Sequence, residues 1–391
     1  MSLRNYVAWV TGILPVWQER GFDPATGLFR ERLHLDGSPD LGADIRVRTH
    51  MRQAYTFAHA AILGLVPRDG ALALAGTAMA SIRARAFAPD GKPGWVHRLS
   101  SDGAVVDARR DLYDHAFALH ALAWMAEATG DAIYRSWSDE TIAAIDTLMA
   151  APAGGWAESD RHELPRRQNP HMHLLEACLA LYETSREPRH LARAAEIVAL
   201  FRTRFFDEEI GTLRDFFGPL WEIDPAHRSD RLDPGHMMEW VWLLRRYERA
   251  SGQPVGRHAA LLFAAAERIG ITRGGFLFDE VDPVGRPVSD GCRLWPQTEY
   301  LKACLAAFEA SGDRDFLAKA DAMAARILEV YVGDSAHGLW IDRFDLAGEI
   351  AVDHVPASIL YHLLAPVVEY LRLAPRLAQP SIADRIATSA A

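Results

Sequence analysis

The chain has 391 residues, 49% of them hydrophobic, which is enough to bury one large core or two ordinary ones. Its formal net charge is −10 and no basic run stands out, so the sequence lacks the electrostatic signature of a nucleic-acid-binding protein. The three cysteines, Cys178, Cys292 and Cys304, suit neither a disulfide framework nor a zinc site. We expect them to be reduced and buried in a cytoplasmic protein.

Residues 2–20 superficially resemble a secretory signal, but the apolar run is short and contains Pro15. A first amphipathic helix is the better interpretation. Because no apolar segment approaches the length of a bilayer span, we expect no membrane association. The apolar period stops near Arg376. The sequence therefore predicts a single domain over 1–375 and a loosely ordered tail over 376–391.

A glycine followed by a bulky apolar residue recurs about every 60 residues, the period of a two-helix unit with a connecting hairpin. The copies are Gly27-Leu28-Phe29, Gly94-Trp95, Gly155-Trp156, Gly211-Thr212-Leu213, Gly275-Phe276 and Gly338-Leu339-Trp340. Turn residues and a return to an acidic residue follow most copies, as in Asp102-Gly103 and then Asp107, which predicts short β-hairpins.

Each predicted hairpin leads into a long helical pattern beginning near Arg48, Asp111, Asn169, Asp233, Pro296 or Pro356. A second, more polar helical pattern precedes the next glycine, at 67–86, 133–150, 187–204, 254–268 and 313–333. Twelve helices in six pairs predict an all-α fold, an (α/α)6 barrel with the helices after the hairpins inside. An open solenoid would use the same unit. Closure is favoured because polar residues gather at one end of the inner helices.

The third inner helix shows that gathering most clearly. Pro170 suits its first turn and Asn169 can cap it. Asn169, His173 and Glu176 share one face, whereas His171 points elsewhere. Equivalent positions on the other inner helices carry Arg52, Tyr113, His236, Glu239, Trp240, Trp295, Gln297, Glu299 and His362. Any one of these suits a structural role, but so many convergent polar groups favour a shared site.

The same residues carry a resemblance to a known family. The motifs RVRTHMRQAYTF, DLYDHAF, NPHMHLLEA, GHMMEW, RLWPQTE and a final YH occur in an order similar to that of the N-acylglucosamine 2-epimerase superfamily. This group includes D-mannose isomerases, sulfoquinose-type aldose–ketose isomerases and cellobiose 2-epimerases. The resemblance covers nearly the whole chain and implies an (α/α)6 barrel that transfers protons at sugar carbon 2 without a cofactor.

The resemblance also implies roles for individual residues. By position, His236 and His362 match the two acid/base histidines and His173 matches the ring-opening histidine. Arg52 matches the oxyanion-stabilising arginine, and Glu239 the carboxylate beside the first catalytic histidine. We expect the sugar to be bound by Tyr113, Asn169, Glu176, Trp240, Trp295, Gln297 and Glu299.

The chemistry is consistent with these roles. Moving a carbonyl between C1 and C2, or inverting C2, requires removing and returning a weakly acidic proton. Two histidines can act as base and acid near neutral pH, and a guanidinium can stabilise the enediolate. The sequence does not show which histidine removes the proton.

Other functions stay open at this stage. A metal isomerase could use His171, His173, His236 and His362, but no HExxH or carboxylate-rich ligand set accompanies them, and we expect no metal. A glycoside hydrolase would need two opposed carboxylates, which Asp114, Asp233 and Glu239 leave possible. A non-catalytic helical-repeat scaffold is the alternative from a different class.

The forms RVRTHMRQ and RLWPQTE look most like the branch of bacterial D-mannose isomerases and related proteins described as mannose-6-phosphate isomerases. We therefore expect an isomerase for D-mannose and D-fructose, with D-lyxose and D-xylulose as a further pair. The alternatives are an N-acylglucosamine-type 2-epimerase and a mannose-6-phosphate isomerase. Arginines near helix starts can accept a phosphate or form ion pairs, namely Arg46, Arg48, Arg166 and Arg167. The expected partner is a small monosaccharide, bound by a monomer or a homodimer.

Overall fold

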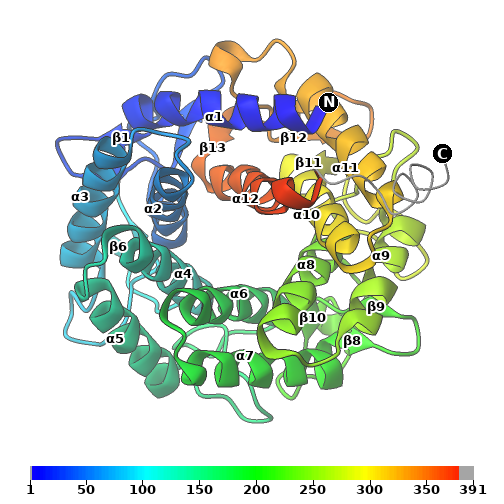
Figure 1. Cartoon of the computed structure of the whole chain (residues 1–391). Helices are drawn as coiled ribbons and strands as arrows, with labels where there is room; N and C mark the ends of the chain where they lie inside the picture. Colours follow the sequence, from blue (N-terminus) through cyan, green and yellow to red (C-terminus); the bar gives the residue numbers. More distant parts are fainter. Residues whose placement is uncertain (1, 378–391) are drawn as a thin grey trace.

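The computed structural model describes residues 2–377 and consists mainly of two concentric rings of helices (Figure 1). The inner ring contains α2 (Val47–Ile62), α4 (Leu112–Thr129), α6 (Gln168–Ser185), α8 (Pro234–Ser251), α10 (Leu294–Ser311) and α12 (Leu360–Leu377). The outer ring contains α1 (Ser2–Arg20), α3 (Arg68–Ala86), α5 (Ile133–Leu148), α7 (Pro188–Leu200), α9 (Gly256–Gly270) and α11 (Arg314–Arg326). In this part of the chain the predicted (α/α)6 barrel is confirmed.

The ring is closed by contacts between the two ends of the chain. Strand β3 (Arg32–His34) pairs antiparallel with β13 (His354–Pro356). Helix α12 packs between α2 and α10, and α1 covers it from outside, where the Tyr6 hydroxyl donates to the carbonyl of Leu363 at 3.0 Å. An open solenoid leaves its terminal repeats apart, so these contacts decide between the two architectures allowed by the sequence.

Helix boundaries follow local sequence signals. Asp111 and Asp233 cap α4 and α8 by accepting from backbone N–H groups of the first turn. Three inner helices end at a glycine with positive φ, namely Gly130, Gly252 and Gly312. The inner helices are buried on nearly every side because outer helices cover one face and the barrel core the other. Polar residues on them must therefore find partners within the protein.

Short strands connect the rings at the end where the inner helices begin. They are β1 (Phe22–Asp23), β2 (Leu28–Phe29), β4 (Ile45–Arg46), β5 (Arg98–Leu99), β6 (Val105–Asp107), β7 (Arg166–Arg167), β8 (Phe206–Asp207), β9 (Thr212–Leu213), β10 (Phe216–Phe217), β11 (Gly291–Arg293) and β12 (Arg343–Asp345). Most pair antiparallel in twos, and β4, β5 and β6 form a three-stranded sheet. Of the hairpins predicted after the glycine motifs, one is formed by β5 and β6, whereas β7 with β10, β11 with β12 and β3 with β13 pair strands of different repeats.

A buried side chain on the inner helix holds the hairpin in four of the repeats. The N–H groups of Phe29, Trp95 and Trp156 donate to ring nitrogens of His50, His115 and His171, at 3.2, 3.1 and 3.0 Å. In the fifth repeat the Leu277 N–H donates to Oε1 of Gln297 at 2.8 Å. Burial lowers the pKa of these histidines, to about 3 for His171, so each stays neutral and can accept. The apolar residue of the repeated motif is therefore anchored through its backbone.

This anchor explains why the repeated motif has glycine at positions 94 and 155. Both residues have positive φ, +92° and +66°. A Cβ on Gly94 would lie 2.5 Å from Nε2 of His115, and one on Gly155 would lie 2.9 Å from Nε2 of His171. Any larger residue would thus displace the imidazole that holds the hairpin.

The outer helices, the cysteines and the C-terminal segment can also be compared with the sequence-based predictions. The second helical patterns become α3, α5, α7, α9 and α11, and short π-helical turns, Phe201–Phe205 and Ile327–Val332, extend α7 and α11. Cys178, Cys292 and Cys304 are buried and form no disulfide. Helix α12 continues to Leu377, so the predicted tail begins as helix, and its remainder lies outside the described residues.

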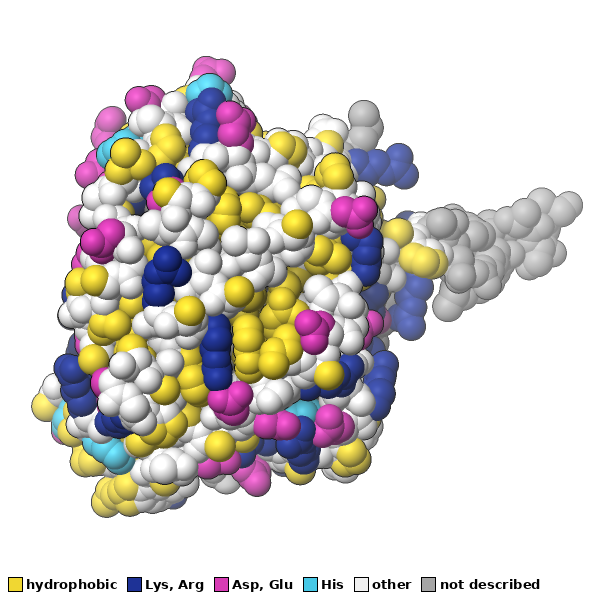
Figure 2. Space-filling view, turned by 90° about the vertical axis from the view of Figure 1, so that its left-hand side faces the viewer, with side chains coloured by type: hydrophobic (Ala, Val, Ile, Leu, Met, Phe, Trp, Pro, Cys, Tyr) yellow, Lys and Arg dark blue, Asp and Glu magenta, His cyan; other side chains and the backbone are white. Residues whose placement is uncertain are grey.

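The surface agrees with the acidic composition. On the face shown in Figure 2, Lys and Arg side chains are scattered among acidic and apolar ones rather than gathered into a basic surface. Over residues 2–377, no helix has the length and apolar character needed to cross a membrane.

The Gly94→Ala variant tests the anchor. An alanine with positive φ costs about 1–2 kcal/mol, and displacing His115 leaves the Trp95 N–H unpaired, which costs about 1–3 kcal/mol more. Gly91→Ala is the matched control, because Gly91 also has positive φ (+80°) but a Cβ there meets no atom within 4 Å. Denaturant unfolding should show the larger loss for Gly94→Ala, and equal losses would contradict the anchor.

Candidate active site

The predicted polar residues surround a cavity of about 420 Å³ at the N-terminal ends of the inner helices. Its lining includes Arg52 from α2, Tyr113 from α4, Asn169 and His173 from α6, His236 and Glu239 from α8, Trp295 from α10 and His362 from α12. Phe216, Glu280, Asp342 and Ser358, among others, line its mouth and walls. Six inner helices thus direct side chains into one small-molecule-sized cavity.

His236 lies against two carboxylates. Its Nδ1 is 2.7 Å from Oδ1 of Asp215 and 3.6 Å from Oδ2 of Asp233, and its Nε2 is 2.9 Å from the amide of Asn169. Burial lowers the pKa of His236, but the charges of Asp233 and Asp215 outweigh it and raise the pKa to about 9. His236 is therefore an imidazolium at neutral pH and can donate a proton.

His362 has the opposite protonation state. Its Nδ1 is 2.8 Å from Oε1 of Glu299, whose other oxygen lies 2.5 Å from Nζ of the fully buried Lys302. Burial, together with the positive charges of Arg52 and Lys302, holds the pKa of His362 well below its usual range. Because a carboxylate only accepts hydrogen bonds, Nδ1 carries the hydrogen and Nε2 is free to accept a proton.

Trp295 lies between these two histidines. Its ring centroid is 5.2 Å from that of His236 and 5.4 Å from that of His362. The chain can approach it closely because residue 235 is glycine, where a Cβ would lie 2.6 Å from the Trp295 ring. The indole thereby provides a flat apolar wall between a proton donor and a proton acceptor.

His173 is fixed on the opposite side by an aromatic and a carboxylate. Its ring stacks on Tyr113 at 4.8 Å, and its Nδ1 lies 3.2 Å from Oε2 of Glu176. The Tyr361 hydroxyl donates to the same Glu176 oxygen at 2.5 Å. Burial lowers the pKa of His173 to about 3 despite Glu176, so this imidazole is neutral.

Arg52 is the cavity arginine without a carboxylate partner among the described residues. Its guanidinium donates to the Tyr113 hydroxyl at 2.8 Å and to the Ser358 carbonyl at 3.2 Å, and it lies 4.1 Å from the Phe117 ring centroid. Its Nε has no partner in that part of the chain. A buried cation with spare donors is suited to stabilise an oxyanion.

Glu239 does not occupy the position expected for it. The carboxylates beside His236 are Asp215 and Asp233, whereas Glu239 Oε1 lies 3.8 Å from Nδ1 of His173 and accepts from Tyr361 at 3.3 Å. Burial and the charge of Glu299 raise the pKa of Glu239 well above its usual range. The carboxyl groups in contact with His236 are thus not that of Glu239, which is a neutral carboxylic acid in the cavity floor and whose catalytic role stays a prediction.

Two residues that were expected to bind sugar make other contacts: one packs against the outer helices and the other anchors a hairpin. Trp240 is fully buried, stacks on Phe201 of the outer wall at 4.5 Å, and donates from Nε1 to Gln168. Gln297 is the hairpin anchor of the fifth repeat. Glu176 and Glu299 lie behind His173 and His362 and position these rings. Of the predicted sugar-binding residues, Tyr113, Asn169 and Trp295 line the cavity.

The sequence reasoning missed Asp215, Tyr361 and Lys302. Asp215 lies outside the inner helices, just before β10, and its distance in sequence from His236 gave no signal. Lys302 follows Glu299 by three residues, a spacing typical of a helical ion pair, and this was the one available hint.

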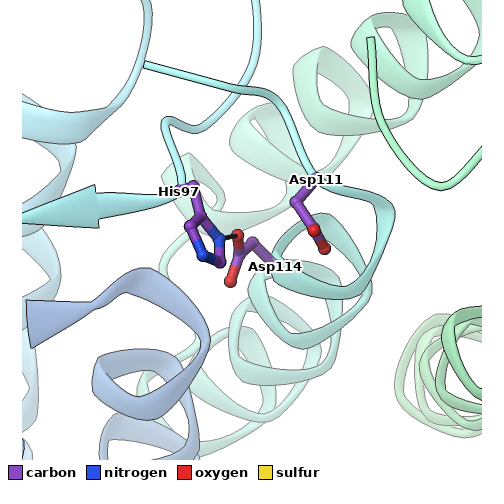
Figure 3. Close-up of side chains that lie close together, drawn as sticks. All are labelled: His97, Asp111 and Asp114. Carbon is purple, nitrogen blue, oxygen red and sulfur yellow. Dashed lines mark hydrogen bonds and ion pairs between the residues drawn. The ribbon is translucent and has the colours of Figure 1, made fainter. Parts of the chain in front are cut away.

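Three groups of side chains bring potential metal-ligand atoms within 4.8 Å of one another: His97 with Asp111 and Asp114, His173 with Glu176 and Glu239, and Glu239 with Glu299 and His362. Their carboxylates are largely engaged by protein donors. In the first group, Asp114 accepts from His97 at 2.6 Å (Figure 3) and from Arg48, while Asp111 caps α4. These side chains therefore hold the segment before β5 and Arg48 in place at the barrel rim, a role that suits them better than binding a metal ion.

The barrel and its histidine-rich cavity are those of a sugar isomerase or epimerase. The family described as N-acylglucosamine 2-epimerase (GlcNAc 2-epimerase) matches residues 27–366, and the chain belongs to this family. It is 35% identical over 371 residues to a mannose-6-phosphate isomerase of Rhizobium meliloti (strain 1021), covering 91% of this chain and 93% of that protein.

A second relative is similar in sequence, and one solved structure is similar in fold. A D-mannose isomerase of Thermobifida fusca is 28% identical over 316 residues, covering 72% of this chain and 74% of that protein. The structure of cellobiose 2-epimerase from Bacillus thermoamylovorans B4167 superimposes with a TM-score of 0.84 at 20% identity, covering 95% of this chain and 98% of that one. The chain is thus an enzyme of a family that isomerises and epimerises sugars.

The elevated pKa of His236 is directly measurable. Replacing Asp233 by Asn keeps the α8 cap, because asparagine caps as well as aspartate, but removes the charge that most raises the His236 pKa. NMR titration should give a pKa of about 9 for His236 in the unchanged protein and a lower value in Asp233→Asn.

Asp111→Asn is the control for this titration, since Asp111 caps α4 in the same manner and does not contact His236. It should leave the His236 pKa unchanged. An Asp233→Asn variant with an unaltered His236 pKa would show that Asp233 does not hold the proton on His236.

Proposed function

We propose that this enzyme is an aldose–ketose isomerase that interconverts D-mannose and D-fructose through a cis-enediolate, with D-lyxose and D-xylulose as a further pair. One observation carries the proposal. Two histidines with opposite protonation states flank one tryptophan, and an arginine without a carboxylate partner lies in the same cavity. Proton removal, charge stabilisation and proton return each have a residue suited to them.

We infer the base and the acid from the protonation states. His362, neutral and with Nδ1 fixed by Glu299, removes the proton from C2 of the aldose through Nε2. His236, charged and held by Asp215 and Asp233, supplies a proton to C1 of the enediolate, and the hydroxyl proton of O2 passes to O1, so that the carbonyl moves from C1 to C2. In the reverse direction the two roles exchange, because each step then runs backwards through the same intermediate.

Arg52 and His173 complete the proposed sequence. The enediolate carries negative charge on oxygen, and Arg52 offers a guanidinium whose charge no carboxylate of the described chain cancels. His173, neutral and oriented by Glu176, is suited to move a proton between the ring oxygen and the anomeric hydroxyl when the sugar ring opens. Glu239, as a neutral acid, offers a hydrogen-bond donor beneath the substrate.

The relatives support an isomerase over an epimerase. Both reactions use the same enediolate, so the acid/base set is compatible with either. The two relatives described as isomerases are 35% and 28% identical to this chain, whereas the related cellobiose 2-epimerase of Bacteroides fragilis is 24% identical. We therefore propose that reprotonation at C1 prevails over inversion at C2.

The charges at the cavity mouth support a free sugar over a phosphorylated one. Arg46 donates to Glu31 at 2.6 Å, Arg48 lies 3.4 Å from Asp114, and Arg293 lies 3.2 Å from Asp279. Arg167 is likewise paired with Glu158, and Arg166 donates to four backbone carbonyls. A phosphate dianion would have to displace carboxylates from these arginines, so a neutral monosaccharide fits better.

Proton NMR of the EDTA-treated protein with D-mannose in D2O tests the reaction. D-Fructose should appear with deuterium incorporated at the carbon that is reprotonated, because an enediolate exchanges its proton with protein groups in contact with solvent. Mannose 6-phosphate, N-acetylglucosamine and cellobiose are the comparison substrates. Faster conversion of any of them than of D-mannose would contradict the proposed substrate, and no conversion of any sugar would contradict the proposed activity.

His362→Gln tests the assigned base, and His171→Gln is its matched control. Both histidines are buried, but His171 anchors a hairpin, a role that a glutamine performs in the fifth repeat of this same chain. His362→Gln should lower kcat by at least about 100-fold, the usual contribution of a general base. His171→Gln should stay within a few-fold of the unchanged enzyme. Similar losses in both variants would point to misfolding rather than to loss of a base.

A further inference from the structure

A second cavity, of about 340 Å³, opens at the other end of the barrel, where the inner helices end. We call it the back cavity. It is lined by Tyr55, His59 and Leu63 of α2, His120 and Trp124 of α4, Glu176 and Glu183 of α6, Trp242, Arg246 and Arg249 of α8, and Ala365, Val368, Glu369, Leu371 and Arg372 of α12. None of these residues lines the active-site cavity. Its size falls at the lower end of the range for small-molecule sites.

The floor of the back cavity contains polar atoms without partners. Both ring nitrogens of His120 and Nε1 of Trp124 are buried and make no hydrogen bond within residues 2–377. The His120 side chain is only 3% exposed, and its nearest charged atom, Oε1 of Glu176, is 3.9 Å from Nε2. Buried donors and acceptors are rarely left unpaired in native proteins. These atoms therefore indicate an occupant that carries both a donor and an acceptor.

Flat aromatic and aliphatic surfaces form the walls. The Tyr55 ring lies 4.3 Å from His120, and His59 stacks on Trp124 at 3.9 Å with an interplanar angle of 21°. Trp242 is held in place by a hydrogen bond from Nε1 to Glu369 at 2.9 Å. Leu63, Ala365, Val368 and Leu371 cover the remaining wall. Such walls favour a flat ring over a flexible polar chain.

Charges at the rim cancel in pairs. Arg246 donates twice to Glu183, at 2.8 and 2.6 Å, and Arg372 donates to Glu369 and Glu309. Deeper in the cavity, Glu176 already accepts from His173 and Tyr361. The rim arginines are each paired with a glutamate, so an anion would find no unpaired positive charge here.

We propose that the back cavity is a second binding site, for a planar heteroaromatic molecule without negative charge that has one hydrogen-bond donor and one acceptor on its ring edge. The ring lies among Tyr55, Trp124 and Trp242, and its edge meets His120 and the Trp124 N–H. An occupant there reaches the side of Glu176 opposite to His173. The site does not depend on the proposed reaction.

Three probes of nearly equal shape test this site. Benzimidazole has both a donor and an acceptor, indole has only the donor, and indene has neither. Calorimetric titration of the full chain should give one site, with benzimidazole binding about fivefold tighter than indole and indole about fivefold tighter than indene, the usual effect of one hydrogen bond. Equal affinities, or no binding by any probe, would overturn the proposal.

Two variants and one competition locate the binding. His120→Phe keeps a flat ring but removes both nitrogens, so the benzimidazole and indene affinities should converge. Val368→Trp fills the cavity from its wall and should abolish binding of all three probes. This variant tests the location even if His120→Phe does not fold. Excess D-mannose, which our proposed function places in the other cavity, should leave benzimidazole binding unchanged. Displacement by mannose, or full binding to Val368→Trp, would overturn the proposed location.

Discussion

The barrel depends on one repeated contact, in which a neutral buried side chain of an inner helix accepts the backbone N–H of the preceding hairpin. His50, His115, His171 and Gln297 make this contact. It fixes each hairpin at the start of its helix, and the first turns of the inner helices therefore face one another across a shared space. An anchor also fixes which face of its helix is turned toward the barrel interior. His173 lies two residues beyond the anchor His171, about 200° around the helix, so it faces the cavity while His171 faces the hairpin.

A second constraint sets the chemistry inside that space. Glu176, Glu239 and Glu299 are buried close together, with Lys302 as the ammonium of that cluster. Several buried carboxylates close together repel one another, so charging all of them would cost much free energy. One of them therefore keeps its proton, and this is Glu239, which has no cation in direct contact to stabilise its charged form. Burial, with the charges of Arg52 and Lys302, then keeps His362 neutral, while Asp233 and Asp215 keep His236 charged against the same burial. Each ring has a carboxylate at Nδ1, so the opposite protonation states come from the further charges around it, which are positive for His362 and negative for His236.

The sequence predicted the helices, their pairing and the cavity residues at helix starts, because these follow from local periodicity, capping and repetition. It did not predict contacts between segments distant along the chain. Asp215 reaches His236 only because β10 pairs with β7 beside it. Trp240 and Gln297 stand at positions equivalent to site residues, yet they face the outer wall and a hairpin, since a shift of one residue turns a helix face by about 100°. The resemblance placed Glu239 beside His236, but the carboxylates in contact with His236 come from Asp215 and Asp233, and such contacts between distant segments are not visible in the sequence.

The direction of the inner helices favours catalysis at one mouth of the barrel over the other. All six begin at the active-site cavity, so their partial positive charges and unpaired N–H groups point toward it. That electric field stabilises the negative charge on an enediolate oxygen, as the charge of Arg52 does. It also lowers the free-energy cost of burying the charged Asp215 and Asp233 beside His236. The other mouth receives the carbonyl ends, where Arg246, Arg249 and Arg372 lie near the last turns and pair with glutamates. An anionic intermediate is therefore stabilised at the N-terminal mouth, whereas the C-terminal mouth suits an occupant without negative charge.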